Sequence, residues 1–243
     1  MKTSNAILGI FSIAVLFFSS CDKNKCVEGS GGNETRTIRL ANFNQLELAE
    51  SADVYISQGA DQQITVTAPA NIIDILNRDV SGSRWVIDFD NHCAKDYKMI
   101  VNIVVPNINE LVISGAGDII MDDMIGGETL SLNISGSGNI SFKQLVSTKN
   151  LNSIISGSGD IYAGTLNSDI QNMDLKISGS GNYRGFNVHS ANSDILISGS
   201  GNVETTTNSN LDVNITGSGN VYYKGFPNIN SNISGSGNVI NRN

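Results

Sequence analysis

A six-residue phrase with potential metal-binding side chains recurs along the second half of the sequence. It reads Ile-Ser-Gly-Ser-Gly-Asn or a close variant, and every copy ends in Asn or Asp. Oxygen atoms of carboxylates and amides are ligands for Ca²⁺, and glycine-rich repeats bind Ca²⁺ in some β-rolls. We call the final residues of the seven copies the ladder residues: Asp118, Asn139, Asp160, Asn182, Asn202, Asn220 and Asn238.

The spacing and charge of the copies disfavour both ion and phosphate chemistry. Five of the seven ladder residues are neutral asparagines, and the copies are about twenty residues apart, unlike nonapeptide calcium repeats. A phosphate-binding loop needs a strand before it, a helix after it and usually a Lys. No copy contains Gly-Lys-Ser or Gly-Lys-Thr, and a strand pattern follows each copy. We therefore predict no metal and no cofactor.

Catalytic residues are sparse in the sequence. His92 and His189 are the only two histidines, and a hydrolase triad would need one of them beside a Ser and a carboxylate. Seven copies of one phrase are a poor way to build one active site. The acidic residues expected on the outer surface are scattered, which indicates a solvated face: Asp169, Asp174, Asp194 and Asp212. We predict that the protein is not an enzyme and has no catalytic residues.

The first cysteine follows a segment typical of an export signal. Lys2 precedes an apolar run of residues 6–18, and Ser19 and Ser20 precede Cys21. Small residues directly before a cysteine resemble the lipobox of bacterial lipoproteins, although Phe18 stands where Leu is usual. The resemblance implies a signal peptide over residues 1–20, cleavage before Cys21 and acylation of Cys21, which anchors the protein to a membrane. Simple secretion is the alternative.

The other two cysteines allow a disulfide. An exported protein reaches an oxidising compartment, where Cys26 and Cys93 can be joined. Two free thiols remain the alternative. No Cys-x-x-Cys pair is present, so the sequence gives no support for a zinc site.

The overall composition argues against nucleic-acid binding. The formal net charge is −8, and aromatic residues make up only 6% of the chain. A nucleic-acid-binding protein needs a basic surface, and single strands are usually held on aromatic side chains. We expect the acidity to serve solubility.

The glycines of the repeated phrase indicate corners of a stacked fold. Each copy begins roughly twenty residues after the copy before it, and a regular interval of this size is typical of stacked coils. Glycine tolerates positive φ, so we expect the glycines to adopt it at sharp corners, and columns of glycine let corners pack closely. These corner glycines are Gly115, Gly117, Gly136, Gly138, Gly157, Gly159, Gly179, Gly181, Gly199, Gly201, Gly217, Gly219, Gly235 and Gly237. We expect the ladder residues to bond to one another from coil to coil.

The segments between corners read as strands. Leu132 and Ile134 alternate with Asn133, and the same alternation recurs in later copies. The sequence predicts an all-β fold, a right-handed parallel β-helix with coils of about 20 residues. We expect a flexible tether over residues 21–35 and one domain over 36–243. Its strand-rich first part covers residues 36–112, with a short helix-like stretch at 71–79, and its seven corner repeats cover 113–243.

Three segments carry a resemblance to a known family. They are FNQLELAESADVYISQG at 43–59, IVNIVVPNINELVISGAGDI at 100–119, and the repeated corner phrase. Together they resemble the family called "putative auto-transporter adhesin, head GIN domain" over roughly residues 36–240. The resemblance implies a β-helical fold and an exported or surface location, with no catalytic residues to transfer.

These observations favour a non-enzymatic lipoprotein of the cell envelope, located at the bacterial outer membrane and facing the periplasm or the surface. Its expected partners are the membrane, through Cys21, and a protein or glycan ligand. A carbohydrate-active β-helix enzyme and a purely structural envelope protein are the alternatives. The sequence shows no obvious cap after the seventh corner, so self-association at that end is a further expectation.

Overall fold

The structure is a computed structural model that describes residues 26–90, 92–122, 124–125, 127–146, 148–166 and 170–243. Residues 1–20, Cys21 and Asp169 lie outside the described residues. No helix in the described part of the chain is both long and apolar enough to cross a membrane.

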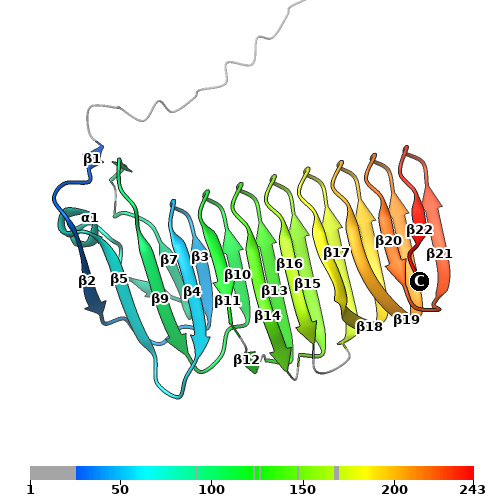
Figure 1. The fold of residues 1–243 in the computed structure, drawn as a ribbon, viewed down its shortest axis with the longest axis horizontal. Helices are drawn as coiled ribbons and strands as arrows, with labels where there is room; N and C mark the ends of the chain where they lie inside the picture. Colours follow the sequence, from blue (N-terminus) through cyan, green and yellow to red (C-terminus); the bar gives the residue numbers. More distant parts are fainter. Residues whose placement is uncertain (1–25, 91, 123, 126, 147, 167–169) are drawn as a thin grey trace, which may run out of the picture.

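The body of the protein is a stack of coils, and each coil contributes one strand to each of two facing sheets (Figure 1). Neighbouring strands within this stack are parallel, because each coil runs in the same direction as the coil before it. The stacked strands are β3 (Gln45–Leu48), β4 (Asp53–Gln58), β7 (Arg84–Ile87), β9 (Ile100–Val105), β10 (Glu110–Ile113), β11 (Asp118–Met121), β12 (Met124–Ile125), β13 (Thr129–Ile134), β14 (Ile140–Val146), β15 (Asn150–Ile155), β16 (Ile161–Leu166), β17 (Ile170–Ile177), β18 (Tyr183–Ile197), β19 (Val203–Ile215), β20 (Val221–Lys224), β21 (Asn228–Ile233) and β22 (Val239–Asn241).

We name the two sheets by their strands. The first face contains β7, β3, β10, β13, β15, β17, the second halves of β18 and β19, and β21. The second face contains β9, β4, β11, β14, β16, the first halves of β18 and β19, β20 and β22. This arrangement confirms the predicted all-β solenoid, whose coils repeat at the interval of the corner phrase.

The order of coils in space differs from their order in the chain at the N-terminal end. Strand β3 lies between β7 and β10, and β4 lies between β9 and β11. The chain therefore forms the β3–β4 coil, places β7 and β9 outside it, and then returns to place β10 and β11 on its other side.

A cap closes this end of the stack. It consists of β1 (Val27–Glu28), β2 (Asn33–Ile38), β5 (Gln63–Pro69), α1 (Ala70–Asp74), β6 (Val80–Ser81) and β8 (Ala94–Lys95). Strand β5 pairs antiparallel with β9, and β2 pairs antiparallel with β5, so the second face continues into the cap. Strands β6 and β7 form a hairpin whose turn holds Gly82 and Ser83 at positive φ. The helix-like stretch predicted at 71–79 corresponds to the single turn of helix α1.

The cap also holds the start of the described chain. A disulfide joins Cys26 to Cys93, and β1 pairs with β8 beside it. The side chain of Asn71 donates to the carbonyl of Glu28 over 2.7 Å and accepts from the N–H of Ser30. The predicted flexible tether over residues 21–35 is therefore wrong for residues 26–35, because pairing and the disulfide fix them to the cap.

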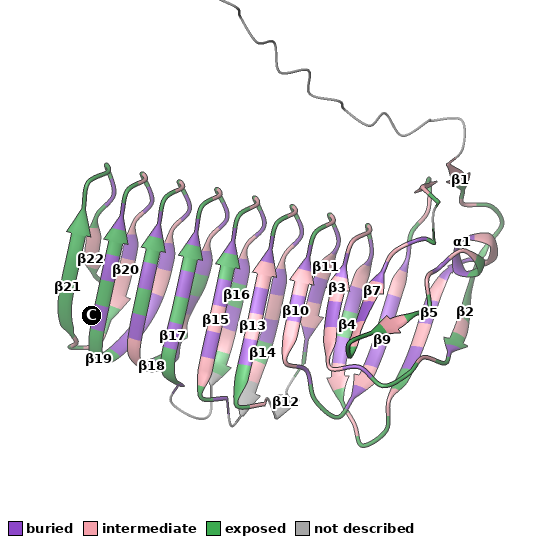
Figure 2. Ribbon diagram, turned by 180° about the vertical axis from the view of Figure 1, so that it is seen from behind, coloured by how far each residue is buried: buried purple, intermediate pink, exposed green. Residues whose placement is uncertain are grey.

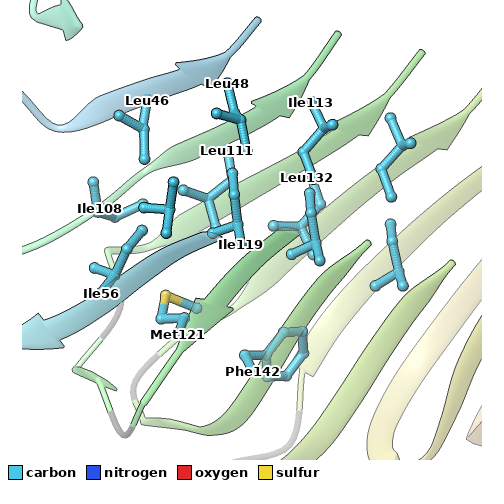
Figure 3. Packing of buried hydrophobic residues seen from close by; sticks show 14 of the residues in the cluster. Leu46, Leu48, Ile56, Ile108, Leu111, Ile113, Ile119, Met121, Leu132 and Phe142 are labelled. Carbon is cyan, nitrogen blue, oxygen red and sulfur yellow. The ribbon is translucent and has the colours of Figure 1, made fainter. Parts of the chain in front are cut away.

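The core lies between the two faces and is built from columns of identical or similar aliphatic residues. One column on the first face runs through Leu48, Ile113, Ile134, Ile155, Ile177, Ile197 and Ile215, all of which are buried. Figure 3 shows Leu111 and Ile113 of the first face directed toward Ile119 and Met121 of the second. Burying one such side chain stabilises a fold by about 1.5–3 kcal/mol, so every coil adds its own contribution.

The corners are stacked as predicted, and of the two reasons expected for their glycines the close packing of corners is confirmed, whereas positive φ is not. Within the described residues, the glycines at positive φ are Gly31, Gly82 and Gly225, none of them a corner glycine. The prediction of positive φ at the corners is wrong. A Cβ atom at Gly138 would instead lie 1.8 Å from the carbonyl oxygen of Gly117, one coil below. The corner requires glycine because successive coils approach too closely there for any side chain.

Candidate functional site

The ladder residues lie at the corner edge of the stack, where they form a continuous chain of hydrogen bonds. The Oδ1 atom of Asn202, for example, accepts the main-chain N–H of Asn220 over 2.9 Å and its side-chain amide over 3.1 Å. The same pair of bonds links Asn182 to Asp160 and Asn139 to Asp118. These side chains hold neighbouring coils together, and the Oδ1 atom of each ladder residue from Asp118 to Asn220 is used as an acceptor for the next coil.

Asp160 differs from the asparagines of the ladder because its second carboxylate oxygen faces outward. Oδ2 accepts from the hydroxyl of Tyr162 over 3.1 Å and lies 3.4 Å from the guanidinium of Arg184. Burial alone would raise the pKa of Asp160, but the hydrogen bonds from Asn182 and Tyr162 and the charge of Arg184 outweigh burial and lower the pKa. Asp160 is therefore a structural carboxylate that stays ionised.

An eighth corner, which the sequence analysis missed, joins β3 to β4. Residues 49–53 read Ala-Glu-Ser-Ala-Asp, and Asp53 stands in register with the ladder residue Asp118. A long connection, residues 88–99, joins β7 to β9 below this corner, so no short corner is stacked beneath it and alanine fits. The pattern Leu-x-Leu-x-x-x-x-Asp-Val, compared with Leu-x-Ile-x-x-x-x-Asp-Ile at 111–119, was the signal that could have revealed it.

The outer surface of the first face carries an acidic column that we did not predict. Asp174 is paired with Asp194, and Asp194 with Asp212, on three adjacent parallel strands. Neighbouring strands are about 4.8 Å apart, so the three exposed carboxylates are stacked. The expectation that these residues are scattered is wrong. They follow one another along the chain at the same intervals as the corners of their coils, so the coils bring them into register.

A second column runs beside the acidic column. Asn172 donates to Oδ1 of Asn150 over 3.0 Å, Asn192 to Asn172 over 3.3 Å, and Asn210 to Asn192 over 2.8 Å. The first face therefore offers rows of amide and carboxylate groups that repeat with the strand spacing.

Three adjoining hollows make the outer surface of the first face concave. The largest two have volumes of about 510 and 440 Å³, and the third has about 400 Å³. The hollows share residues, so they form one continuous groove across β10 to β19. The residues that belong to two hollows are Glu110, Thr129, Ser131, Asn152 and Asp174.

The charges of the groove are mostly negative. Glu110 is neutralised by Arg84 at 2.7 Å, and Asp212 accepts a hydrogen bond from the amide of Asn230. Asp174 and Asp194 form no ion pair or hydrogen bond with any residue that the structure describes. The groove can therefore attract a cationic group and can hydrogen-bond to hydroxyl or amide groups of a ligand.

Catalytic and metal-binding arrangements are not visible in the groove. Neither His92 nor His189 lines its three hollows. Among the described residues, no group of three or more His, Cys, Asp or Glu side chains is placed to hold a metal ion.

A second polar cluster lies near the cap, beside the eighth corner. The hydroxyl of Tyr97 donates to Glu50 over 3.3 Å. Burial raises the pKa of Glu50 and, together with the neighbouring carboxylate, raises the pKa of Tyr97 to about 12. This pair closes the space between the corner and the 88–99 connection and opens onto none of the three hollows of the groove.

Comparison with known proteins agrees with the solenoid and its corners. The family "putative auto-transporter adhesin, head GIN domain" matches residues 42–227. The match covers most of the chain, and the protein belongs to this family. No protein with a curated description matches the chain significantly.

Several solved structures share the fold. A putative adhesin from Bacteroides fragilis superposes with a TM-score of 0.79 at 22% identity, covering 89% of this chain and 100% of its own. A putative adhesin from Parabacteroides distasonis gives 0.71 at 24% identity, and a putative lipid binding protein from the same species gives 0.68 at 25% identity. Each covers 90% of this chain and 100% of its own.

Proposed function

We propose that the protein is a non-enzymatic binding protein of the cell envelope, anchored by lipid at Cys21, that holds a protein or glycan ligand in the groove of the first face. The family and two of the related structures are described as putative adhesins, and a third as a putative lipid binding protein, which supports a binding role at an exported location.

The observation that carries this proposal is the acidic column. Like charges directly opposite on neighbouring strands destabilise a sheet, and Asp174 and Asp194 have no partner among the described residues that relieves the repulsion. A residue pattern that opposes stability is typical of functional sites. A ligand that donates hydrogen bonds or carries positive charge would remove the repulsion on binding.

The rigid backbone of the groove suits a repetitive ligand. Amides and carboxylates recur on every strand of the first face from β15 to β19, so a linear ligand would meet the same groups at each step of about 4.8 Å. Backbone order also reduces the entropy lost on binding.

The proposed anchor is consistent with the position of the disulfide. Only residues 22–25 separate Cys21 from Cys26, and they can span at most about 18 Å to the cap. An acylated Cys21 would therefore keep the cap near the membrane and leave the rest of the stack free to extend from it.

Binding can be tested with glycan and peptide arrays and with washed cells. We expect a ligand whose affinity falls at least tenfold in the triple variant Asp174→Asn, Asp194→Asn, Asp212→Asn. A matched control, Asp61→Asn, Asp79→Asn, Glu204→Gln, changes the net charge equally but lies outside the groove. Equal losses in both variants, or no ligand across broad panels, would refute the proposed binding face.

The anchor is tested separately. We expect Cys21→Ser to abolish labelling by a radioactive or clickable fatty acid, and Cys26→Ser to leave the labelling intact. Unchanged labelling of Cys21→Ser would refute the lipid anchor without bearing on the groove.

One observation favours a second candidate, carbohydrate cleavage. Asp174 and Asp194 stand opposite each other on neighbouring strands. Strands are spaced by about 4.8 Å, which is close to the carboxyl separation of about 5 Å in retaining glycosidases. Release of reducing sugar from a polysaccharide panel, lost in Asp194→Asn, would replace the binding proposal with this one.

A further inference from the structure

The last coil of the stack has two strands with unpaired outer edges. Strand β21 pairs only with β19, and β22 pairs only with β20, within the described part of the chain. The ladder ends here as well. Oδ1 of Asn238 accepts none of the hydrogen bonds formed among the described residues, whereas Oδ1 of Asn220 accepts two.

The inward positions of this coil are exposed to solvent. Ile229 and Ile233 are 43% and 40% exposed, although they continue the columns of Leu211 and Ile215, which are fully buried. Figure 2 shows β21 coloured as exposed along its whole length. Phe226, just before β21, is 90% exposed. The end of the stack therefore exposes large apolar side chains at positions that belong to the core in the preceding coils.

The edge lacks the usual protection against pairing. Residues 225–241 contain no charged side chain, and edge strands are normally protected by Lys, other charges or a covering element. The opposite end has such protection, since its edge strand β2 carries Glu34 and Arg36 and helix α1 packs beside it. Because the edge strand at the cap carries charges and lies beside α1, a head-to-tail filament is disfavoured.

We propose that this end binds the same end of a second copy of the chain, related by a two-fold axis that passes through both faces. The axis makes β21 antiparallel to the β21 of the other copy, and β22 likewise, so both sheets become continuous. This inference does not depend on the proposed ligand groove.

The sequence of β21 is complementary to itself in one register. Inward side chains must oppose inward side chains, and among the registers that this permits, the one that covers both isoleucines pairs Ile229 with the partner's Ile233 and Ser231 with the partner's Ser231. Asn230 then opposes the partner's Asn232 on the outer surface, where two amides can exchange hydrogen bonds. The contact would bury the same aliphatic columns that every interior pair of coils already buries.

The size of the surface is sufficient for a dimer. The terminal coil contributes residues 226–243, which is close to the roughly 20 residues per partner of a standard protein interface. Its composition also fits, because Ile229 and Ile233 flank the central Ser231 and β21 itself carries no charged side chain.

The register makes Ser231→Cys the sharpest test. Directly opposed residues of an antiparallel pair have Cα atoms about 4.5–5.5 Å apart, which permits a disulfide. We expect the full chain with Ser231→Cys, oxidised in native membranes, to migrate as a dimer on a non-reducing gel. Lys176→Cys, exposed in the middle of the first face, is the control and should stay monomeric.

A second substitution separates specific pairing from chance collision. Adding Ile229→Lys to Ser231→Cys places a charge in the proposed contact and should reduce the dimer at least fivefold. Light scattering of the unmodified chain should give twice the monomer mass. A monomer mass, equal cross-linking of both cysteine variants, or cross-linking of Ser231→Cys to a different protein would overturn the proposal.

Discussion

Asn182 donates both its main-chain N–H and its side-chain amide to one oxygen, Oδ1 of Asp160, over 2.7 and 2.9 Å. The relationship explains why Asn and Asp occupy the end of every corner. Each side-chain oxygen satisfies a main-chain donor of the next coil, which the sheet hydrogen bonds do not reach. The ladder is thus a third line of hydrogen bonds beside the two sheets.

Removal of one ladder side chain should be costly. In Asn202→Ala the N–H and the amide of Asn220 lose their acceptor, and an unsatisfied donor costs about 1–3 kcal/mol. We expect this loss in the free energy of unfolding measured with denaturant. Asn214→Ala, exposed on the first face, is the control and should change stability by less than about 0.5 kcal/mol. Equal effects would show that the ladder does not stabilise the stack.

The corner glycines should not tolerate even one methyl group. A Cβ at Gly138 would lie 1.8 Å from the carbonyl oxygen of Gly117, and both atoms belong to main chain that cannot move aside alone. We expect Gly138→Ala to destabilise by about 3 kcal/mol or more and to lower the melting temperature clearly. Gly32→Ala has open space around it and should melt like the unmodified protein. An unchanged melting curve for Gly138→Ala would contradict the close approach of the coils.

The repeated half of the fold could be predicted because one short phrase marks each coil. The spacing of the corners gives the coil length, and the alternation of residues such as Leu132 and Asn133 gives the inward direction. The role of the ladder residues also follows from stacking. The sequence also indicated that glycine columns let the corners pack closely. This is confirmed, because a Cβ placed at the corner glycines from Gly117 to Gly237 would lie 1.8–2.0 Å from a carbonyl oxygen of the coil below. The sequence could not give the backbone dihedral angles of the corner, so positive φ was expected there as well.

The part of the chain before the first corner repeat was harder to interpret for a physical reason. The β3–β4 corner carries Glu50 and Ala52 where later corners carry glycine, because no short corner lies beneath it. Nothing in the local sequence indicates that β7 is placed outside β3. The acidic column was missed because Asp174, Asp194 and Asp212 were judged one by one and not by their shared interval.

Asp160 should contribute to stability in a pH-dependent manner. Its pKa is lowered in the folded protein, so its contribution is present above the unfolded value near 4 and is lost as pH falls through the folded value. Asp160→Asn keeps the ladder acceptor, so we expect stability within about 1 kcal/mol of the unmodified protein at pH 7. The two unfolding free energies should converge or cross as pH falls below the unfolded value near 4 and through the lower folded value.

Arg184→Gln provides the matched comparison. It removes one of the interactions that lower the pKa of Asp160, so the loss of stability should begin at a higher pH than in the unmodified protein. If the unfolding free energies of all three proteins fall identically as the pH is lowered, Asp160 does not govern acid sensitivity.

The disulfide should stabilise the cap because it restricts the conformations of the unfolded chain. Cys26 and Cys93 are separated by 67 positions, and the loop-entropy relation gives about 4 kcal/mol for a loop of that size. We expect the double variant Cys26→Ser, Cys93→Ser to unfold at lower denaturant concentration and to be cleaved faster by protease near β1. Reduction of the unmodified protein should reproduce both effects. Protease cleavage at the same rate in all three samples would show that β1 is held by pairing alone.

Removal of the Tyr183 hydroxyl should maintain or increase stability, whereas Asn202→Ala and Gly138→Ala should reduce it. Its ring is fully buried beside Gly185, where a Cβ would lie only 2.3 Å from the ring, and its hydroxyl is buried without a partner among the described residues. Burial also raises the pKa of Tyr183 well above its ordinary value. Tyr183→Phe keeps the ring and removes the unsatisfied hydroxyl, so we expect equal or greater stability, by up to about 1–2 kcal/mol. Tyr183→Ala should instead lose about 3–5 kcal/mol by leaving a cavity. A clear loss of unfolding free energy in Tyr183→Phe would mean that the hydroxyl has a partner in the folded protein, such as a buried water.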